Sequence, residues 1–261
     1  DIIDINGNVL YDDSYYSSTQ IPDPWVWGDI GNYYGSGVSG LNYSDNTVFV
    51  EFESREAGSL TKIKSVSPEF NQLDYENRVV ADNIRSDQAY IFGAPDMNNR
   101  FITGRIPQNR KSFKVKGSIP NPGLFMAESF LNHLRHDSLV YNGFVKQHIQ
   151  LIDSSFILVD SYESPKLSDI VFKINQHSVN LFAEGLLREI AKQKTLNSEF
   201  SSGANYIKQY WANKGVYTQN LFVKDGSGLS RFNGVSASTL VDVLKKMRGN
   251  SSLYASLPIA G

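Results

Sequence analysis

A serine and an asparagine lie two positions apart in the segment INQHSVNLFAEGLLREIAKQ, residues Ile174 to Gln193. A hydroxyl can donate or accept a proton and a carboxamide can hold a peptide backbone, so Ser178 and Asn180 could serve one binding cleft. Residues two apart on a helix point about 200° away from each other. If the pair acts together, it must lie on a non-helical turn before the helix. The structural alternative makes Ser178 an N-cap and Asn180 a first-turn polar residue.

The element that must position this pair is an amphipathic helix that we expect to begin at about Asn180. Apolar residues at helical spacing predict a buried stripe, made of Leu181, Phe182, Leu186, Leu187 and Ile190. Charged residues on the other face are expected to meet water, namely Glu184, Arg188, Glu189 and Lys192. Core packing therefore explains the helix but not the two polar residues at its start.

The character of the chain changes once along its length. Short strands are predicted in the first part, at residues 47–53, 89–93, 100–106 and 111–117, and the opening residues predict a strand around an Asn6-Gly7 turn. Helices are predicted from Gly123 to Arg135, after Ser164-Pro165, over 204–213 up to Lys214-Gly215, and over 237–248 between Ser236 and Gly249. Further strands are predicted at 154–162 and 218–223. The fold class is α+β or α/β, with a β-rich region at 1–148 and a helical region at 149–261.

Composition restricts the function classes. The chain has 261 residues, 41% of them hydrophobic, which is enough for a sizeable core. A net charge of -2 and a pI near 6.1 argue against a nucleic-acid partner. There are no cysteines, which excludes a disulfide framework, thiolate metal sites and a cysteine nucleophile. No apolar run has the length of a membrane span. The first residues contain no initiator Met and no signal-peptide core and begin inside a predicted strand, so we expect a processed or truncated product.

Long strings in both regions resemble one enzyme family. The segment VKDGSGLSRFNGVSAS, residues 223–238, and the segment ESPKLSDIVFKINQHSVNLFAEGLLRE, residues 163–189, resemble the class C, low-molecular-mass penicillin-binding proteins. YDDSYY at 11–16 and PWVWGDIGNYYGSGVSGLNYSDN at 24–46 resemble the part that this family carries between its first two motifs. These proteins are D-alanyl-D-alanine carboxypeptidase/endopeptidases. The resemblance implies part of a penicillin-binding domain of the β-lactamase-like transpeptidase type, preceded by a β-rich inserted domain.

The family's machinery comes from three motifs. Ser-x-x-Lys supplies the nucleophile, Ser-x-Asn supplies a hydroxyl and an amide, and Lys-Thr-Gly lines the cleft. Ser178-Val179-Asn180 matches the second motif, so the resemblance implies catalytic roles for Ser178 and Asn180. Ser59-Leu60-Thr61-Lys62 matches the first literally but lies in a predicted hairpin, and Lys224-Asp225-Gly226 mimics the third poorly. We therefore expect both outer motifs to be missing and the chain to be an inactive internal fragment.

The resemblance also implies a substrate and a location. The family attacks peptidoglycan stem peptides through an acyl-enzyme, and β-lactams inhibit the intact enzyme by the same route. Arg231 is a candidate for binding a carboxylate of the stem peptide, with a structural salt bridge as the alternative. Tyr15 and Trp25 are candidates for the pocket wall, or else core residues, and Asp225 is either a site residue or a turn former. A periplasmic or cell-envelope location follows.

No cofactor or metal is predicted, and no oligomeric state. His133 and His136 are three apart, but no carboxylate motif accompanies them. Two other function classes stay open. The chain could be a non-catalytic cell-wall-binding or scaffolding relative, or a hydrolase that uses Ser59 after all.

Overall fold

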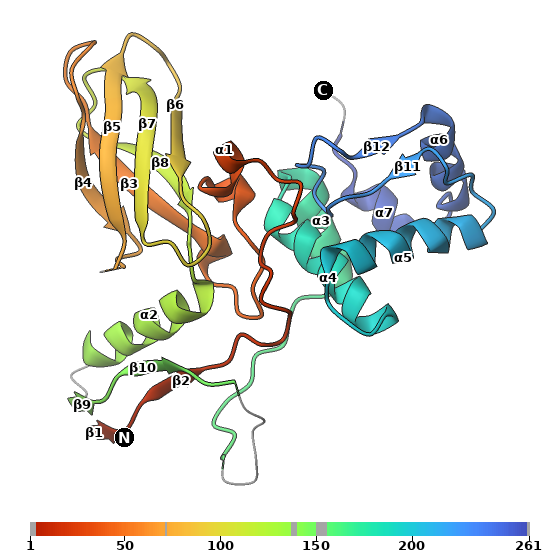
Figure 1. Cartoon of the computed structure of the whole chain (residues 1–261), viewed down its shortest axis with the longest axis horizontal. Helices are drawn as coiled ribbons and strands as arrows, with labels where there is room; N and C mark the ends of the chain where they lie inside the picture. The colour runs from red at the N-terminus through yellow and green to blue at the C-terminus, as the bar shows by residue number, and fades with distance from the viewer. Residues whose placement is uncertain (1–3, 71, 137–139, 150–155, 260–261) are drawn as a thin grey trace. The chain divides into compact units, whose positions relative to one another are not determined.

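The computed structural model describes residues 4–70, 72–136, 140–149 and 156–259. The chain forms two compact units. The first, which we call the β-rich unit, comprises Asp1–Ile21 and Trp25–Ile149, and the second, the helical unit, comprises Pro22–Pro24 and Gln150–Gly261. Each unit is described by itself (Figure 1). Helices and sheets are both present, as the predicted α+β class requires.

Two three-stranded sheets form the centre of the β-rich unit. One has the order β4-β3-β8, with β3 at Thr47–Glu53, β4 at Lys62–Ser67 and β8 at Phe113–Ser118, all antiparallel. The other has the order β5-β7-β6, with β5 at Asp74–Asp82, β6 at Gln88–Phe92 and β7 at Asn99–Pro107. β5 runs parallel to β7, and β6 runs antiparallel to it.

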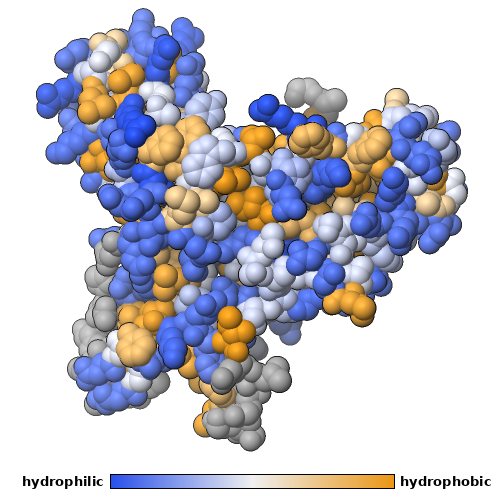
Figure 2. All heavy atoms as spheres, in the orientation of Figure 1, coloured by the Kyte–Doolittle hydropathy of each residue, from blue (hydrophilic) through white to orange (hydrophobic). Residues whose placement is uncertain are grey.

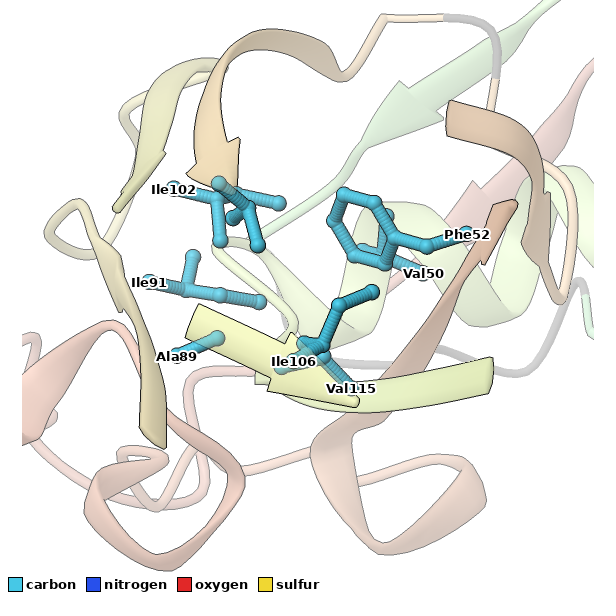
Figure 3. Close-up of a cluster of buried hydrophobic side chains, with 8 residues drawn as sticks. Val50, Phe52, Ala89, Ile91, Ile102, Ile106 and Val115 are labelled. Carbon is cyan, nitrogen blue, oxygen red and sulfur yellow. The ribbon is translucent and has the colours of Figure 1, made fainter. Parts of the chain in front are cut away.

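Alternating side chains place the core between these sheets. Along β3, Val48, Val50 and Phe52 are fully buried while the residues between them are partly exposed, which is the period of two expected of a strand. Val50 and Phe52 pack with Val115 of β8 and with residues of the second sheet, including Ile91 and Ile106 (Figure 3). Hydrophilic residues cover most of the visible outer surface of these strands (Figure 2).

The predicted strands at 47–53, 89–93, 100–106 and 111–117 all appear, as β3, β6, β7 and β8. Strands β4 and β5 lack a clear apolar alternation in sequence and were not predicted individually. The hairpin expected around Ser59 is confirmed, since β3 and β4 pair antiparallel across it. Ser59 lies in the turn, where its hydroxyl donates to the Glu56 carbonyl at 2.6 Å, and Lys62 begins β4.

Short segments join the sheets to the start of the unit. α1 spans Trp27–Ile30, and two 3-10 turns follow it, η1 at Tyr33–Gly35 and η2 at Ser44–Asn46. Between α1 and η1, the Asn32 side chain accepts a hydrogen bond from the Ile91 amide at 3.0 Å, and the Gly31 carbonyl accepts one from the Ser118 amide at 3.0 Å. These bonds tie the segment to β6 and β8 at once.

Both ends of the β-rich unit pair with each other. β1 at Asp4–Asn6 runs parallel to β9 at Val140–Asn142, and β2 at Val9–Tyr11 runs parallel to β10 at Val145–Gln147. The two strands that flank Asn6-Gly7 therefore pair with distant residues and not with one another. α2, at Pro122–His136, packs on β2 and β10 and confirms the helix predicted from Gly123.

The helical unit contains five helices among the described residues. They are α3 at Leu167–His177, α4 at Asn180–Lys194, α5 at Phe200–Asn213, α6 at Ala237–Lys246 and α7 at Ser251–Ser256. α4 packs on α5 and α3 packs on α7 (Figure 1). Ser236 caps α6 as predicted, because its side chain accepts from the Thr239 amide at 3.2 Å. A short antiparallel ladder joins β11, Leu221–Phe222, to β12, Gly234–Val235.

The strand predicted at 154–162 is wrong where the structure describes it. Ser154 and Ser155 lie outside the described residues, and 156–162 have no regular structure. Ile157 and Val159 are 86% and 93% exposed. An apolar β-branched run becomes a strand only when a neighbouring strand satisfies its backbone, and no described strand pairs with it. Among the described helices, none has the length and apolar character needed to cross a membrane.

Candidate active site

Ser178 occupies the junction between α3 and α4 in an unusual conformation. It is the C-cap of α3, with φ 54° and ψ 49° in the left-handed region, where a non-glycine residue is disfavoured. Its side chain is exposed, and its hydroxyl makes no hydrogen bond to any described residue. The N-cap of α4 is Val179, without a side-chain cap bond, so the alternative of Ser178 as the N-cap is wrong.

Asn180 is the first residue of α4 and is half-buried. A shared site was expected to need both polar residues on the turn, but the structure places only Ser178 outside the helix. The two side chains need not point in opposite directions, because the separation of about 200° applies only when both residues are helical. The hydroxyl of Ser178 and the amide of Asn180 therefore come from one short junction at the start of α4.

The buried face of α4 differs from the expected stripe. Leu181 and Leu187 are buried as predicted, but Glu184 and Arg188 are fully buried as well. The expectation that these two charged residues face water is wrong. The reason is tertiary, because the Asp225–Asn233 segment and the Ser198 region cover that face with polar backbone groups that the charged side chains bind.

Glu184 connects α4 to the loop that carries the DGSGLSR string. Its carboxylate accepts hydrogen bonds from the Gly226 amide at 2.9 Å and the Ser227 amide at 2.8 Å. Burial raises the pKa of Glu184 to about 7; the nearby Asp225 charge raises it as well, while the two amides act in the opposite direction. The loop is thereby held against α4 one turn beyond Asn180.

The close approach of the loop explains one of its glycines. A Cβ on Gly226 would lie 2.4 Å from the Ala183 carbonyl oxygen, so no side chain fits at this position. Asp225 is buried and organises the rest of the loop: it accepts from the Gly228 amide at 2.8 Å, the Ser230 amide at 2.6 Å and the Asn233 side chain at 2.7 Å. Of the two roles considered for Asp225, turn formation is the one that the structure shows.

Arg231 follows the buried Ser230 on this loop and is exposed. The structural salt bridge that we considered is absent, since Arg231 pairs with no carboxylate among the described residues. The guanidinium is thus displayed on the same loop that Glu184 holds against the first turns of α4. This arrangement leaves its donors available for a carboxylate from outside the chain.

The other candidates, Tyr15 and Trp25, belong to the β-rich unit. Tyr15 is 48% exposed and meets the Tyr16 ring edge-on at 5.0 Å, whereas Trp25 is buried at 8% exposure. Among the described residues, no group of three or more His, Cys, Asp or Glu side chains could hold a metal ion. The His136 side chain lies outside what the structure describes.

Glu184 is the residue that sequence reasoning missed. A glutamate in an amphipathic helix is ordinarily a solvated residue, and the sequence near Glu184 has no feature that marks it as buried. The sequence feature that could have indicated its burial lies in the Asp225–Asn233 loop. That loop is rich in glycine, and its buried backbone amides require an acceptor.

Comparison with known proteins extends these observations to the whole chain. The model of the D-Ala-D-Ala carboxypeptidase 3 (S13) family matches residues 2–261. The D-alanyl-D-alanine carboxypeptidase DacB of Haemophilus influenzae is 27% identical over 98% of this chain and 54% of its own length. The D-alanyl-D-alanine carboxypeptidase of Actinomadura sp. strain R39 is 25% identical over 98% of this chain and 50% of its own. The chain thus spans about half the length of these relatives.

A solved structure agrees with the fold. The crystal structure of penicillin binding protein 4 (dacB) from Haemophilus influenzae matches with a TM-score of 0.80 and 25% identity, over 99% of this chain and 58% of that one. A second structure of that protein, complexed with a novel β-lactam, matches with a TM-score of 0.68 and 23% identity over 87% of this chain and 54% of that one. On the family match over residues 2–261, the chain belongs to the D-Ala-D-Ala carboxypeptidase 3 (S13) family.

Proposed function

We propose that this chain is part of a serine-type D-Ala-D-Ala carboxypeptidase or endopeptidase that acts on peptidoglycan stem peptides. The observation that carries the proposal is the exposed Ser178 hydroxyl, held in a left-handed turn before α4, in a chain that the family model matches from residue 2 to residue 261. Strained turns that display a polar group are typical of functional sites.

The proposed roles follow from the chemistry of each group. The hydroxyl of Ser178 transfers a proton, the carboxamide of Asn180 holds the substrate backbone, and Arg231 binds a carboxylate of the stem peptide. Tyr15 is proposed to bind the substrate through its exposed aromatic ring. These assignments suit a peptide substrate, since a carboxamide offers both a donor and an acceptor to a backbone amide.

The proposed reaction is acyl transfer. A serine outside this chain loses its hydroxyl proton as its oxygen bonds to the carbonyl carbon of the penultimate D-alanine. The C–N bond to the terminal D-alanine breaks, the released amine takes up a proton, and an ester between the serine and the peptide remains. Water then hydrolyses the ester and restores the serine. Within this chain Ser59 is a poor nucleophile, because it lies in a hairpin turn and its hydroxyl is bonded to the Glu56 carbonyl. Chain residues 1–148 act as the inserted region and 149–261 as part of the catalytic domain.

The same proposal covers inhibitors and location. β-lactams acylate the serine that attacks the substrate, and the Haemophilus influenzae relative has been solved in complex with a β-lactam. A protein that acts on cell-wall peptides works outside the cytoplasm, in the periplasm or cell envelope.

Labelling with a fluorescent penicillin tests the proposal. We expect the complete reading frame that contains this chain to be labelled covalently, and the 261-residue chain alone to remain unlabelled. In the complete protein, Ser178→Ala should slow acylation about 10²-fold to 10⁴-fold, the range for a lost proton-transfer group. Ser227→Ala, on the neighbouring loop but without a proposed catalytic role, is the control and should acylate at nearly the normal rate.

Two results would change the assignment. Labelling of the 261-residue chain that disappears in Ser59→Ala would identify Ser59 as the nucleophile. A complete protein that is never labelled but sediments with purified peptidoglycan would favour the non-catalytic, cell-wall-binding alternative.

A further inference from the structure

A pocket of about 380 Å³ lies within the β-rich unit, between η1 and the strands β6 and β8. Both strands are terminal in their sheets among the described residues. Its lining includes six side chains able to bind a ligand, namely Tyr33, Tyr34, Asp87, Tyr90, Lys114 and Lys116. The volume falls within the range of about 300–1,000 Å³ that is usual for small-molecule sites.

Aromatic rings form part of the pocket wall. Tyr33 and Tyr90 are each 48% exposed, and Tyr34 meets the Tyr33 ring edge-on at 5.4 Å. Burial, with the charge of Asp29 and the nearby phenols, raises the pKa of Tyr34 to about 12, so its hydroxyl stays protonated at neutral pH. The pocket therefore offers flat apolar faces next to hydroxyl groups, a combination that suits the C–H face and the hydroxyls of a sugar ring.

Positive charge is concentrated on one side of the pocket. Lys114 and Lys116 lie two apart on β8 and are both exposed, so they project from the same face of the strand. The ammonium of Lys116 lies 5.1 Å from the centroid of the Tyr33 ring. Neither lysine forms an ion pair with a carboxylate in the described part of the chain. Asp87 is the acidic side chain of the lining, which leaves two cations against one anion in a chain of net charge -2.

Lys116 is better placed than Lys114 to meet an anion. Hydrogen bonds from Ser112 and Ser65 lower the pKa of Glu51, and the charges of Lys64 and of Lys114, its partner across the strands, add to that effect. The partner of Lys116 is Phe49, which carries no charge, and the ammonium lies 5.9 Å from the Phe49 ring centroid. The ammonium of Lys116 thus lies near two aromatic rings, and no carboxylate is paired with it among the described residues.

We propose that this pocket binds an acidic saccharide, a pyranose ring with a carboxylate substituent, whose ring packs on Tyr33 and Tyr90 and whose carboxylate binds Lys116. The ligand class follows from the pocket alone. The use of a cell-wall sugar as the probe rests on the proposed function. Binding at this pocket would attach the protein to the glycan part of its polymer.

An NMR titration of the 261-residue chain tests this proposal. The probe is the disaccharide of N-acetylglucosamine and N-acetylmuramic acid, and the uncharged comparison is N,N′-diacetylchitobiose. We expect the acidic disaccharide to shift the amide resonances of residues 88–90 and 114–116, with binding at least tenfold tighter than that of chitobiose. Lys116→Gln should remove this preference for the charged sugar, since a hydrogen bond to a charged group commonly contributes a tenfold factor or more.

The controls use exposed residues of the same unit. Lys62→Gln removes an exposed lysine from β4, outside the pocket, and should leave both affinities unchanged. Tyr90→Ala should weaken both disaccharides, and Tyr90→Phe should restore most of the binding if the ring face is what matters. Equal binding of the two sugars, an unchanged affinity in Lys116→Gln, or no shifts at all would overturn the proposal. So would a free stem peptide that shifts these residues when the sugars do not. Penicillin labelling of the complete protein is a separate readout, so labelling that persists when this titration fails would leave the proposed function standing.

Discussion

Glu184 places an ionisable group where water cannot reach it. Its side chain is 0% exposed, and both of its carboxylate oxygens bind backbone amides of the Asp225–Asn233 loop. Burial and the neighbouring Asp225 disfavour the charged form, whereas the amide hydrogen bonds favour it, and the net result is a pKa raised to about 7. The attachment of the loop to α4 is therefore coupled to pH near neutrality.

This coupling predicts how stability depends on pH. A carboxyl group whose pKa is about 7 when folded and near its ordinary value of 4.5 when unfolded holds a proton more tightly in the folded state. The stabilising contribution of Glu184 to the free energy of unfolding is therefore fully present below pH 4.5, and it is lost as the pH rises through 7. We expect the free energy of unfolding of the helical unit to fall by about 2 kcal/mol between about pH 5 and pH 7.5. Urea unfolding at the two pH values measures this change in the free energy of unfolding.

The matched variant is Glu184→Gln, which keeps the shape of the side chain and removes its titration. Its stability should change little between about pH 5 and pH 7.5, and at the lower pH it should be close to that of the parent chain. An equal slope in the two proteins would mean that Glu184 titrates at its ordinary pKa and that another group dominates.

Ser178 allows stability and activity to be separated. Its φ of 54° is unfavourable for a residue with a Cβ and costs glycine little, so Ser178→Gly should be more stable than Ser178→Ala by about 1 kcal/mol. Both variants lose the hydroxyl and should acylate with penicillin equally slowly in the complete protein. Thermal unfolding and labelling rates measure the two effects. Faster labelling of the glycine variant, or lower stability than the alanine variant, would contradict the proposed role of the turn.

At the scale of elements, β3 shows how one strand serves two surfaces. Phe52 faces the core between the sheets, whereas Phe49 is half-buried on the other face under Lys114 and Lys116. Phe52→Ala should lower the free energy of unfolding of the β-rich unit by about 3–5 kcal/mol, because it leaves a cavity in a packed core. Phe49→Ala should cost about 1 kcal/mol, mainly through lost cation–π contacts. Chemical denaturation followed by circular dichroism compares the unfolding free energies of the two variants. Similar losses of stability in both would show that the core is misassigned.

Most individual elements could be predicted from sequence because their patterns are local. Strand β3 alternates cleanly, α4 has an apolar stripe, and α6 begins at a serine that caps it. The prediction of a strand at 154–162 failed because it rested on local sequence alone. An apolar run shows a preference for extended structure, but it forms a strand only where a neighbouring strand pairs with it. The prediction that Glu184 faces water failed for a similar reason, since its burial depends on a loop 42 residues away in the sequence.

At the scale of the whole molecule, the candidate site was predicted by long matching strings more than by its geometry. The family was identified from segments in both halves of the chain, and the family model matches residues 2–261. The same strings gave Ser178, Asn180 and Arg231 as candidates. The left-handed turn at Ser178 had no such signal, because it arises from backbone geometry. The pocket between η1, β6 and β8 had none either, because its strands are distant in sequence.

The parallel pairing of β1 with β9 and of β2 with β10 brings the two ends of the β-rich unit to one place. Asn6 and Asn142 are 136 positions apart in the chain, yet their side chains are 3.3 Å apart. A stretch whose two ends meet in this way can be added to a host protein, or replaced by a short tether, without pulling the host's own backbone out of place. The β-rich unit therefore has the meeting ends that an insertion into a host chain requires.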